Sequence, residues 1–381
     1  MILHIVIDDK FIDMAYNVFE KVSPNNNEFM VVTNQNKFKY IRITPITCIS
    51  PQEFLDKSFA KKLLQYEFVV LHWLDDFKKI LVLNAPEKVK FVWIGWGGDY
   101  YCYTKKDLFL PLTKEYLNKV KKKNIGNKII SELKYAVKNI LLNKKLNMKV
   151  NTGEIFNKVD FFAPVIKEDY DLVSSSIENF KPKYISWNYG TLEDDFIKDL
   201  NSKVSGNNIL IGNSATPENN HLDTFKILRD MDLRDRKLIC PLSYGDSGYA
   251  KYISNIGSLY FGENFHPISE FMPIDNYRNM LKSCSVAIMN HLRQQALGNI
   301  IMMLYMGAKV FLNKESPVYS FFKKQGAKIY STDELCTEEI NTKLKDEDIE
   351  RNRDILRKHW NRDVILSKTE KMIETLRYYK K

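Results

Sequence analysis

A cation, two amides, a glycine and an asparagine stand between two apolar runs in the second half of the chain. They are Arg293, Gln294, Gln295, Gly298 and Asn299, and they follow the apolar run Val286–Asn290. That run predicts a buried strand and the following run an apolar helix. A fixed cation and free helix N–H groups bind a diphosphate, and a glycine lets the backbone approach it. A solvated βα loop would contain the same residue types, so this loop alone leaves both interpretations open.

Two more predicted strand ends in this half are polar. The run Ile209–Gly212 leads into Asn213 and Ser214, whose small size and polar groups suit a phosphate. A later run leads into Ser243 and Tyr244, which could line the same cleft. The alternative for each is a capped βα turn without a ligand, because neither has the spacing of a Walker or dinucleotide motif. Three such ends in one half favour a shared phosphate and sugar pocket.

A glycine-rich aromatic loop, Gly95–Tyr101, follows another predicted strand in the first half. Trp96 and Tyr100 offer flat apolar faces for a sugar ring, and Asp99 offers a carboxylate that could accept a hydroxyl proton. We therefore expect Trp96 and Tyr100 to bind an acceptor and Asp99 to act as general base. The alternative is an aromatic packing cluster in which Asp99 caps a helix.

Asp9 and His72 end two further predicted strands, Ile2–Ile7 and Phe68–His72. The carboxyl ends of parallel strands share one sheet edge, so both residues could converge on the acceptor site, Asp9 as the second candidate base. Considered alone, an aspartate or a histidine at a strand end more often has a structural role than a catalytic one. The histidines show no H-x-x-x-H pairing and the carboxylates no ligand spacing, so the sequence predicts neither a metal site nor a cofactor.

Alternating apolar strands and helical patterns predict an α/β protein of two Rossmann-like domains facing a central cleft. At 381 residues the chain is long enough for two cores. We expect an acceptor domain at 1–195, a nucleotide-sugar domain at 205–355 and a C-terminal helix at 356–381 that could cross back. The expected strands include Lys39–Ile43 in the first domain and Ser258–Phe261 in the second.

The five cysteines are widely spaced and without a C-x-x-C pair, which is typical of free, mostly buried thiols in a reducing compartment. The N-terminus reads as a strand rather than a secretory signal, and no apolar run reaches the ~18 residues of a membrane span. These features predict a cytoplasmic protein.

The segment Lys105–Lys149 contains thirteen lysines and three acidic residues, so it accounts for the whole net charge of +10. Its apolar residues recur at helical spacing, which predicts basic amphipathic helices. A solvated face, a surface for anionic lipid and a nucleic-acid patch are the three interpretations. Nucleic acid is disfavoured, because the segment has no arginine and no base-stacking module accompanies it.

Five motifs taken together resemble the TDP-N-acetylfucosamine:lipid II N-acetylfucosaminyltransferase family, which is glycosyltransferase family 56 and 4-alpha-L-fucosyltransferase-like. The motifs are Trp96–Tyr101, Leu210–Ser214, Pro241–Gly245, Arg293–Gly298 and Leu312–Pro317. The resemblance implies a GT-B fold whose second half binds a nucleotide sugar. It also implies action at the cytoplasmic membrane face on an undecaprenyl-diphosphate-linked saccharide.

We therefore expect a metal-independent GT-B glycosyltransferase that moves a dTDP-linked, deoxy-amino or fucose-type sugar onto a lipid-linked glycan in bacterial surface polysaccharide synthesis. Glu315 follows the strand Val310–Leu312 and would be available for a ribose hydroxyl. The lysine-rich helices would hold the acceptor domain on the anionic inner face of the cell membrane. A non-catalytic protein that binds a nucleotide sugar or another anion in the same cleft is the alternative.

Overall fold

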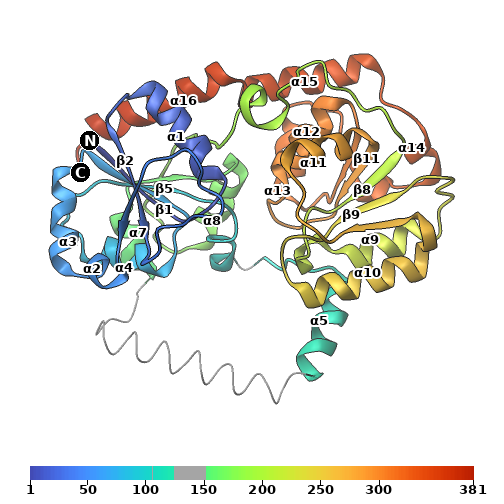
Figure 1. Cartoon of the computed structure of the whole chain (residues 1–381), viewed down its shortest axis with the longest axis horizontal. Coiled ribbons are helices and arrows are strands. Elements are labelled where there is room, and N and C mark those ends of the chain that lie inside the picture. Colours follow the sequence, from blue (N-terminus) through green and yellow to red (C-terminus); the bar gives the residue numbers. More distant parts are fainter. Residues whose placement is uncertain (105, 124–151) are drawn as a thin grey trace.

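The structure, a computed structural model, describes residues 1–104, 106–123 and 152–381. Two parallel sheets lie at opposite ends of the molecule, each covered by helices on both faces (Figure 1). The expected α/β fold with two Rossmann-like units is confirmed.

The first sheet has seven parallel strands in the order β3-β2-β1-β4-β5-β6-β7. Alternate residues of β1 pack into apolar clusters on opposite faces, Leu3 and Ile5 on one and Ile2 and Val6 on the other. A strand that is buried on both faces is apolar at most positions, and His4 is the one polar residue within β1. The strands are β1 Ile2–Val6, β2 Asn27–Val32, β3 Ile46–Ile49, β4 Phe68–His72, β5 Phe91–Ile94, β6 Phe161–Ala163 and β7 Lys183–Tyr184.

Local side chains cap the starts of α2, α3 and α4 in this half. Asp75, for example, accepts the backbone N–H of Lys78 at the start of α4. The helices are α1 Phe11–Val22, α2 Pro51–Phe54, α3 Lys57–Lys62, η1 Leu63–Gln65, α4 Asp76–Asn84, η2 Tyr101–Tyr103, α5 Pro111–Lys123, α7 Thr152–Lys158, α8 Lys167–Ser176 and the π-helix η3 Leu192–Phe196.

The second sheet has six parallel strands in the order β10-β9-β8-β11-β12-β13. The strands are β8 Asn208–Ile211, β9 Leu238–Pro241, β10 Phe265–Ile268, β11 Cys284–Met289, β12 Lys309–Leu312 and β13 Tyr330–Ser331. The helices are η4 Pro217–Asn219, α9 His221–Leu228, α10 Ser247–Phe261, η5 Gly262–Asn264, α11 Ile274–Lys282, α12 Leu297–Met306, α13 Pro317–Lys324, η6 Thr332–Glu334, α14 Thr337–Asn341, α15 Asp346–Trp360 and α16 Arg362–Tyr378.

Both sheets reverse their strand order at one point, between β1 and β4 in the first and between β8 and β11 in the second. Loops diverge at such a switch point and leave a crevice at the carboxyl ends of the strands, where open α/β sheets bind ligands. The fold therefore places Asp9 beside one switch point and the Arg293 loop beside the other.

The expected strand Lys39–Ile43 does not form. The backbone N–H groups of Lys39, Tyr40 and Ile41 donate to the Asp8 carboxylate at 2.6–3.0 Å, and the next three donate to Asp13. These donors are not free for a sheet, and the third strand is Ile46–Ile49 instead. The expected strand Ser258–Phe261 is also wrong, because α10 continues through Phe261.

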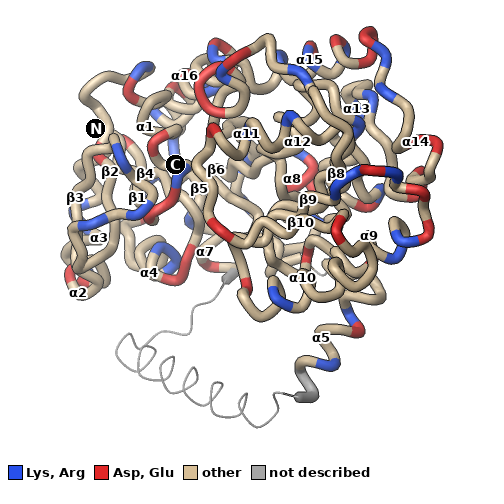
Figure 2. The backbone as a smooth tube through the Cα atoms, turned by 45° about the vertical axis from the view of Figure 1, so that its right-hand side comes forward, with Lys and Arg blue, Asp and Glu red and all other residues tan. Residues whose placement is uncertain are grey.

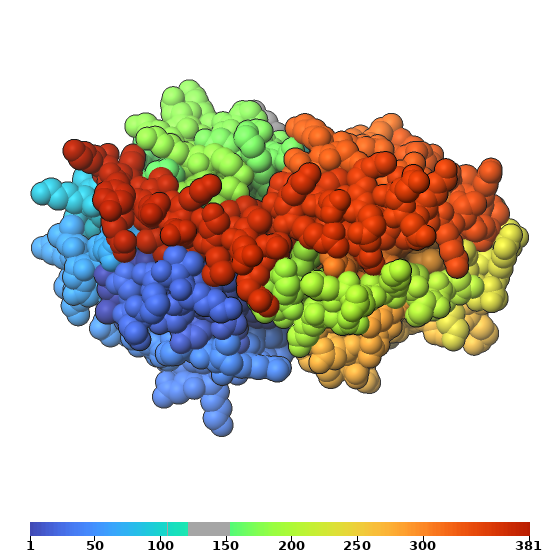
Figure 3. Space-filling model, turned by 90° about the horizontal axis from the view of Figure 1, so that it is seen from above, coloured from blue at the N-terminus to red at the C-terminus, as the bar shows by residue number. Residues whose placement is uncertain are grey.

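Two helices pack on the half of the molecule to which they do not belong by sequence. α16 lies against α1 and places Met372, Ile373 and Leu376 in the first core, so the C-terminal helices run along both halves (Figure 3). α5 packs on α9 of the second half, where Leu112 and Tyr116 join the apolar cluster.

The placement of α5 differs from the expectation that the lysine-rich segment belongs to the acceptor domain. Asp223 of α9 accepts the backbone N–H groups of Leu112 and Thr113 at 2.9 and 3.1 Å, which fixes the start of α5. Lys114 and Lys119 on α5 pair with Asp107 and Glu115. Basic and acidic residues both lie along α5 (Figure 2). Lys105 and residues 124–149 of the segment lie outside the described part of the chain.

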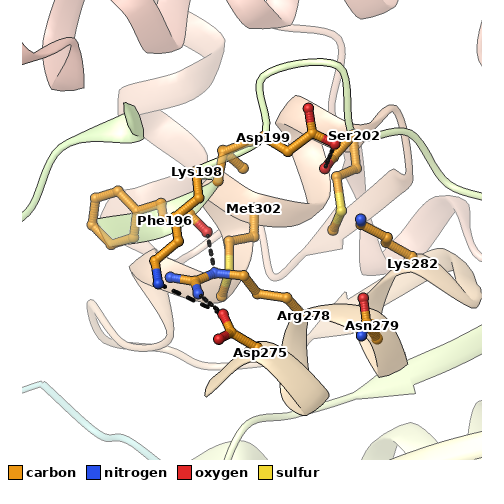
Figure 4. Close-up of a pocket in the computed structure, with 11 residues that line it drawn as sticks. Phe196, Lys198, Asp199, Ser202, Asp275, Arg278, Asn279, Lys282 and Met302 are labelled. Carbon is orange, nitrogen blue, oxygen red and sulfur yellow. Dashed lines mark hydrogen bonds and ion pairs between the residues drawn. The ribbon is translucent and has the colours of Figure 1, made fainter. Parts of the chain in front are cut away.

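The linker between the halves passes along α11 (Figure 4). The Arg278 guanidinium donates to the backbone carbonyls of Phe196, at 3.0 Å, and Asp195, and pairs with Asp275 at 2.7 Å. These contacts fix the path of the linker. A pocket beside it is lined by Phe196, Ile197, Lys198, Asp199, Ser202, Asp275, Arg278, Asn279, Lys282, Met302 and Met306.

Candidate active site

The two halves touch through a pair of loops, one after β5 and one after β11. Gly97 has a φ of +100°, and a Cβ there would lie 2.9 Å from Gln294 Oε1 and 3.3 Å from Arg293 Nη1. Only glycine tolerates both the conformation and the approach. The aromatic loop and the Arg293 loop, which are far apart in the sequence, are therefore direct neighbours.

Arg293 is half-buried and makes few contacts that would occupy its donors. Its Nη1 donates to the Gln294 carbonyl at 3.1 Å, and its guanidinium carbon lies 6.0 Å from the centre of the Tyr101 ring. In the described part of the chain no carboxylate forms an ion pair with it. A guanidinium has five N–H donors, so most remain for a ligand such as a diphosphate.

The helix α12 begins directly after this loop without a side-chain cap. Ala296, at its N-cap, has the left-handed conformation with φ 60° and ψ 19°. A non-glycine residue held there is strained, and such strain is typical of functional loops. The uncapped first turn leaves N–H groups free for an anion, which the helix dipole also favours.

Asn219 ties the loop after β8 to the loop after β11. Its Oδ1 accepts the backbone N–H of Asn213 at 2.8 Å and the Nε2 of His291 at 2.9 Å. Its Nδ2 donates to the Ser214 hydroxyl at 3.2 Å. Burial holds the pKa of His291 well below its usual value, so the ring stays neutral and Nε2 carries the proton. This network makes a rigid floor beneath the second switch point.

The structure brings the predicted phosphate residues together above this floor. Gly212 has a φ of +63°, and a Cβ there would lie 2.6 Å from Asn219 Oδ1, so glycine is required. Gln295 Nε2 donates to Asn213 Oδ1 at 3.0 Å. The Oε1 atoms of Gln294 and Gln295 are buried and have no partner in the described structure, which leaves acceptors for a ligand. Ser214 is buried and belongs to the floor rather than to the surface.

Four of the predicted donor residues lie at the rim. Ser243 and Tyr244 are exposed, and the Tyr244 carbonyl accepts the N–H of Ala215 at 2.6 Å, so their loop borders the one after β8. Glu315, after β12, is exposed. Asn299 uses one amide N–H to donate to the Tyr277 hydroxyl at 2.8 Å, so its backbone N–H and its second amide N–H are left for an anion.

Gly298 is placed differently from the expectation that it allows a diphosphate to approach. A Cβ at this position would point to the ring of Phe196 at 3.4 Å, so its open side faces the linker. Its backbone N–H, in the first turn of α12, is the group available to a ligand.

Asp99 is a structural carboxylate in this structure, contrary to the expected role of general base. Its Oδ2 accepts the Trp93 indole at 2.7 Å and the Leu74 N–H at 3.0 Å, and its Oδ1 accepts the Trp96 N–H at 2.8 Å. The residue is 5% exposed. Burial raises its pKa, but all three donors bind the charged form and fold the loop around it.

Asp9 is the better-placed carboxylate. It follows β1 at the first switch point, is half-buried, and its Oδ1 accepts the N–H of Phe11 at 3.0 Å. In the described part of the chain no side chain donates to it. Burial raises its pKa, which is the direction that improves a carboxylate as a base.

Of the three expected acceptor-binding residues, only Trp96 is partly exposed. His72 is fully buried, with Nε2 3.1 Å from His4 Nδ1 and Nδ1 2.5 Å from the Tyr189 hydroxyl. Tyr100 is also fully buried and donates to Asp169 at 2.6 Å. Neither can contact an acceptor in this structure.

The sequence analysis missed Tyr189, Asn219 and Asp169. Tyr189 and Asp169 lie far from their partners along the chain, and so does Asn219 from His291. His291 carried a local signal, because it lies two residues after the end of β11 and two residues before Arg293. All five cysteines are free, but Cys48, Cys102 and Cys336 are exposed rather than buried.

Among the described residues, no group of three or more His, Cys, Asp or Glu side chains could hold a metal ion. None of the helices in those residues is both long and apolar enough for a bilayer span.

Solved structures share this arrangement of two units. HepE from Anabaena, in complex with UDP and glucose, matches with a TM-score of 0.62 at 11% identity over 98% of each chain. A glycosyltransferase from Rickettsia africae matches at 0.60 and 13% identity, over 100% of this chain and 99% of its own. The trehalose-6-phosphate synthase OtsA matches at 0.58 and 9% identity, over 100% and 99%. At such identities the likeness shows the fold, which is GT-B.

The family match and the fold together define the class: the chain is a glycosyltransferase of the GT-B fold. The family match covers residues 190–353, which fit the model of 4-alpha-L-fucosyltransferase, glycosyl transferase group 56. It confirms the resemblance over this part of the chain, which contains the loops after β8 and β11 and Glu315.

Proposed function

We propose that the enzyme transfers a sugar from a dTDP-linked donor to a lipid-linked saccharide at the membrane surface, in the synthesis of a bacterial surface polysaccharide. The proposed donor site rests on one observation about Arg293. This half-buried residue forms no ion pair with a carboxylate in the described structure, and it lies just before the uncapped start of α12. The family match favours a transferase over the non-catalytic binding protein.

The proposed reaction needs three groups of this chain. An acceptor hydroxyl oxygen attacks the anomeric carbon of the donor sugar, and its proton passes to the Asp9 carboxylate. The bond from the anomeric carbon to the phosphate oxygen breaks, and the electron pair leaves with the nucleoside diphosphate. Arg293 and the first N–H groups of α12 stabilise the charge that develops on that oxygen, so this step requires no divalent cation.

The donor half is tested by nucleotide binding. Wild type and Arg293→Ala are titrated calorimetrically with dTDP, UDP and GDP, and their melting temperatures are compared with and without each. We expect dTDP to bind most tightly to wild type. Loss of one charged contact typically costs about 2 to 5 kcal/mol, so Arg293→Ala should bind at least about 30-fold more weakly. Unchanged dTDP affinity in the variant would remove Arg293 from the donor site.

The acceptor and the metal requirement are tested by turnover. Transfer from a dTDP-sugar to an undecaprenyl-diphosphate-linked saccharide is measured with and without EDTA. Activity that persists in chelator is the expected result. Loss that magnesium or manganese restores would show a carboxylate metal site, and transfer only to water-soluble glycans would contradict the lipid-linked acceptor.

A further inference from the structure

Tyr101 connects the acceptor half to the residue that follows Arg293. It lies in η2, directly after the glycine-rich loop of the first half. Its hydroxyl oxygen is 2.8 Å from the backbone nitrogen of Gln294 and 2.6 Å from Asp169 Oδ1. Asp169, on α8, is fully buried, and its Oδ2 accepts the Tyr100 hydroxyl at 2.6 Å.

The direction of each hydrogen bond in this chain follows from chemistry. A backbone N–H can only donate, so the Tyr101 oxygen accepts from Gln294. The phenol proton must then point to the carboxylate of Asp169, which accepts. A phenol that donates to a carboxyl oxygen has a fixed rotamer and proton position, and the bond is strongest while Asp169 is ionised. Gln294 therefore donates to Tyr101, and Tyr101 donates to Asp169, so these two hydrogen bonds link the halves with fixed donors and acceptors.

The same tyrosine also supports the guanidinium. The Arg293 guanidinium carbon is 6.0 Å from the Tyr101 ring centre, within the range of a cation–π contact. Arg293 gains the attraction of the ring without a carboxylate that would compete with a phosphate. Gly97, from the same loop, leaves room for the Arg293 loop, because a Cβ there would collide with Gln294 Oε1 and crowd Arg293 Nη1.

We propose that Tyr101, braced by Asp169, is a positioning residue that sets the Arg293 loop for the donor diphosphate from the acceptor half. The proposal rests on the proposed function of Arg293 in binding that diphosphate. It adds that donor affinity depends on a residue of the opposite half, so the donor site is complete only when the two halves are joined as seen here.

Tyr101→Phe tests the link by removing one oxygen and keeping the ring. Gln294 loses its acceptor, so we expect dTDP affinity and kcat/KM for the donor to fall about 10-fold to 100-fold. Tyr100→Phe is the matched control, because it removes a hydroxyl from the same carboxylate at the same distance but leaves Gln294 untouched. We expect less than a threefold change in dTDP affinity for that variant.

Calorimetric titration with dTDP, donor KM and kcat, and thermal melting are measured for wild type, Tyr101→Phe, Tyr100→Phe and Arg293→Ala. A structural role alone would lower both tyrosine variants' melting temperatures and leave their dTDP affinities equal. If Arg293→Ala loses dTDP binding and the two tyrosine variants match each other, the positioning role is wrong and the donor site stands. If Arg293→Ala binds dTDP normally, the proposed donor site fails first.

Discussion

The indole Nε1 of Trp96 donates to the Tyr189 hydroxyl at 2.8 Å, and the two rings meet edge to face with centres 5.7 Å apart. Phe11, two residues after Asp9, packs against both rings. The candidate base and the candidate sugar platform therefore share one aromatic cluster at the first switch point, and Tyr189 joins it to the core.

Tyr189 ends a chain of hydrogen bonds through His72 and His4 to Asn27, and the donor and acceptor of each bond can be assigned. The Asn27 Nδ2 donates to Glu20 at 2.9 Å and to the Ser23 carbonyl at 2.7 Å, so its Oδ1 must accept from His4 Nε2. His4 Nδ1 then accepts from His72 Nε2, and His72 Nδ1 accepts the Tyr189 proton. Burial lowers the pKa of His4 to about 3 and that of His72 well below its usual value, so both rings are neutral and these tautomers persist.

Tyr189→Phe should impair acceptor use selectively. The change leaves the Trp96 indole and His72 Nδ1 without their partner, and an unsatisfied buried group costs about 1 to 3 kcal/mol. We expect a rise in acceptor KM, with dTDP affinity retained. Tyr170→Phe is the control, because its hydroxyl donates to the Pro182 carbonyl away from Trp96. An acceptor KM equal in the two variants would exclude a role for Tyr189 in positioning Trp96.

Asp9→Asn should almost abolish turnover with little effect on folding or dTDP binding. Removing a positioned base costs on the order of 10²- to 10⁴-fold in rate, and asparagine can still accept the Phe11 N–H.

Asp99→Asn is the paired variant. Its amide would face an N–H donor, so we expect about 1 to 3 kcal/mol less stability, measured by urea unfolding. Near-normal turnover in Asp9→Asn would show that the base is elsewhere, and full stability with lost turnover in Asp99→Asn would restore Asp99 to that role.

Asp169 should make the free energy of unfolding depend on pH. Burial raises its pKa to about 7, although the hydroxyls of Tyr100 and Tyr101 and the charge of Arg293 oppose the rise and Glu168 adds to it. The folded state therefore holds a proton that the unfolded state releases at about pH 4, and this contribution to stability is lost as pH rises through about 7.

Urea unfolding at pH 5, 6, 7 and 8 checks this sign. Wild type should lose stability over this range relative to Asp169→Asn, which has no carboxyl to titrate, by on the order of a few kcal/mol. The difference between the two proteins removes the contributions of other titrating groups. Parallel curves for the two proteins would mean that Asp169 does not titrate in this range.

The lysines at the end of α5 should hold the protein on anionic vesicles. Each lysine near an anionic surface contributes about 1 kcal/mol, so changing Lys121, Lys122 and Lys123 to Gln should weaken vesicle binding on the order of 100-fold at low salt. The matched control changes the exposed Lys57, Lys61 and Lys62 of α3 to Gln, which removes the same charge. Co-sedimentation with phosphatidylserine and phosphatidylcholine vesicles is the measurement. Equal binding of both variants, or none to either lipid, would make α5 an ordinary solvated helix.

Local patterns predicted the fold and the strand ends of the second half but not the surroundings of most proposed acceptor residues. An apolar run followed by small and polar residues marks a strand end wherever the strand lies, so the sequence correctly placed Gly212 after β8 and Arg293 after β11. A strand that is buried on both faces has no alternation, so nothing showed that His72 points into the core.

Whether a carboxylate points into the core or toward a ligand depends on hydrogen-bond donors that can be distant in sequence. Asp99 is held by Leu74 N–H from the end of β4, and Asp169 by tyrosines nearly 70 residues before it. The same effect removed the expected strand at Lys39, since Asp8 took its backbone donors. Sequence gives the types of these groups, whereas their partners are set by tertiary packing.

The positions of α5 and α16 mean that neither half is a contiguous stretch of the chain. A fragment spanning 205–355 would lack α5, and so would expose the face of α9 that Leu112 and Tyr116 cover and leave Asp223 without its partners. A fragment ending before α16 would open the first core beside α1. Proteolysis at the linker would cut the chain without separating the two halves. α5 would still pack on the second half, and α16 would still pack on the first. Expression boundaries drawn at the linker would yield insoluble protein, and a circular permutant opened there would be the more tolerant design.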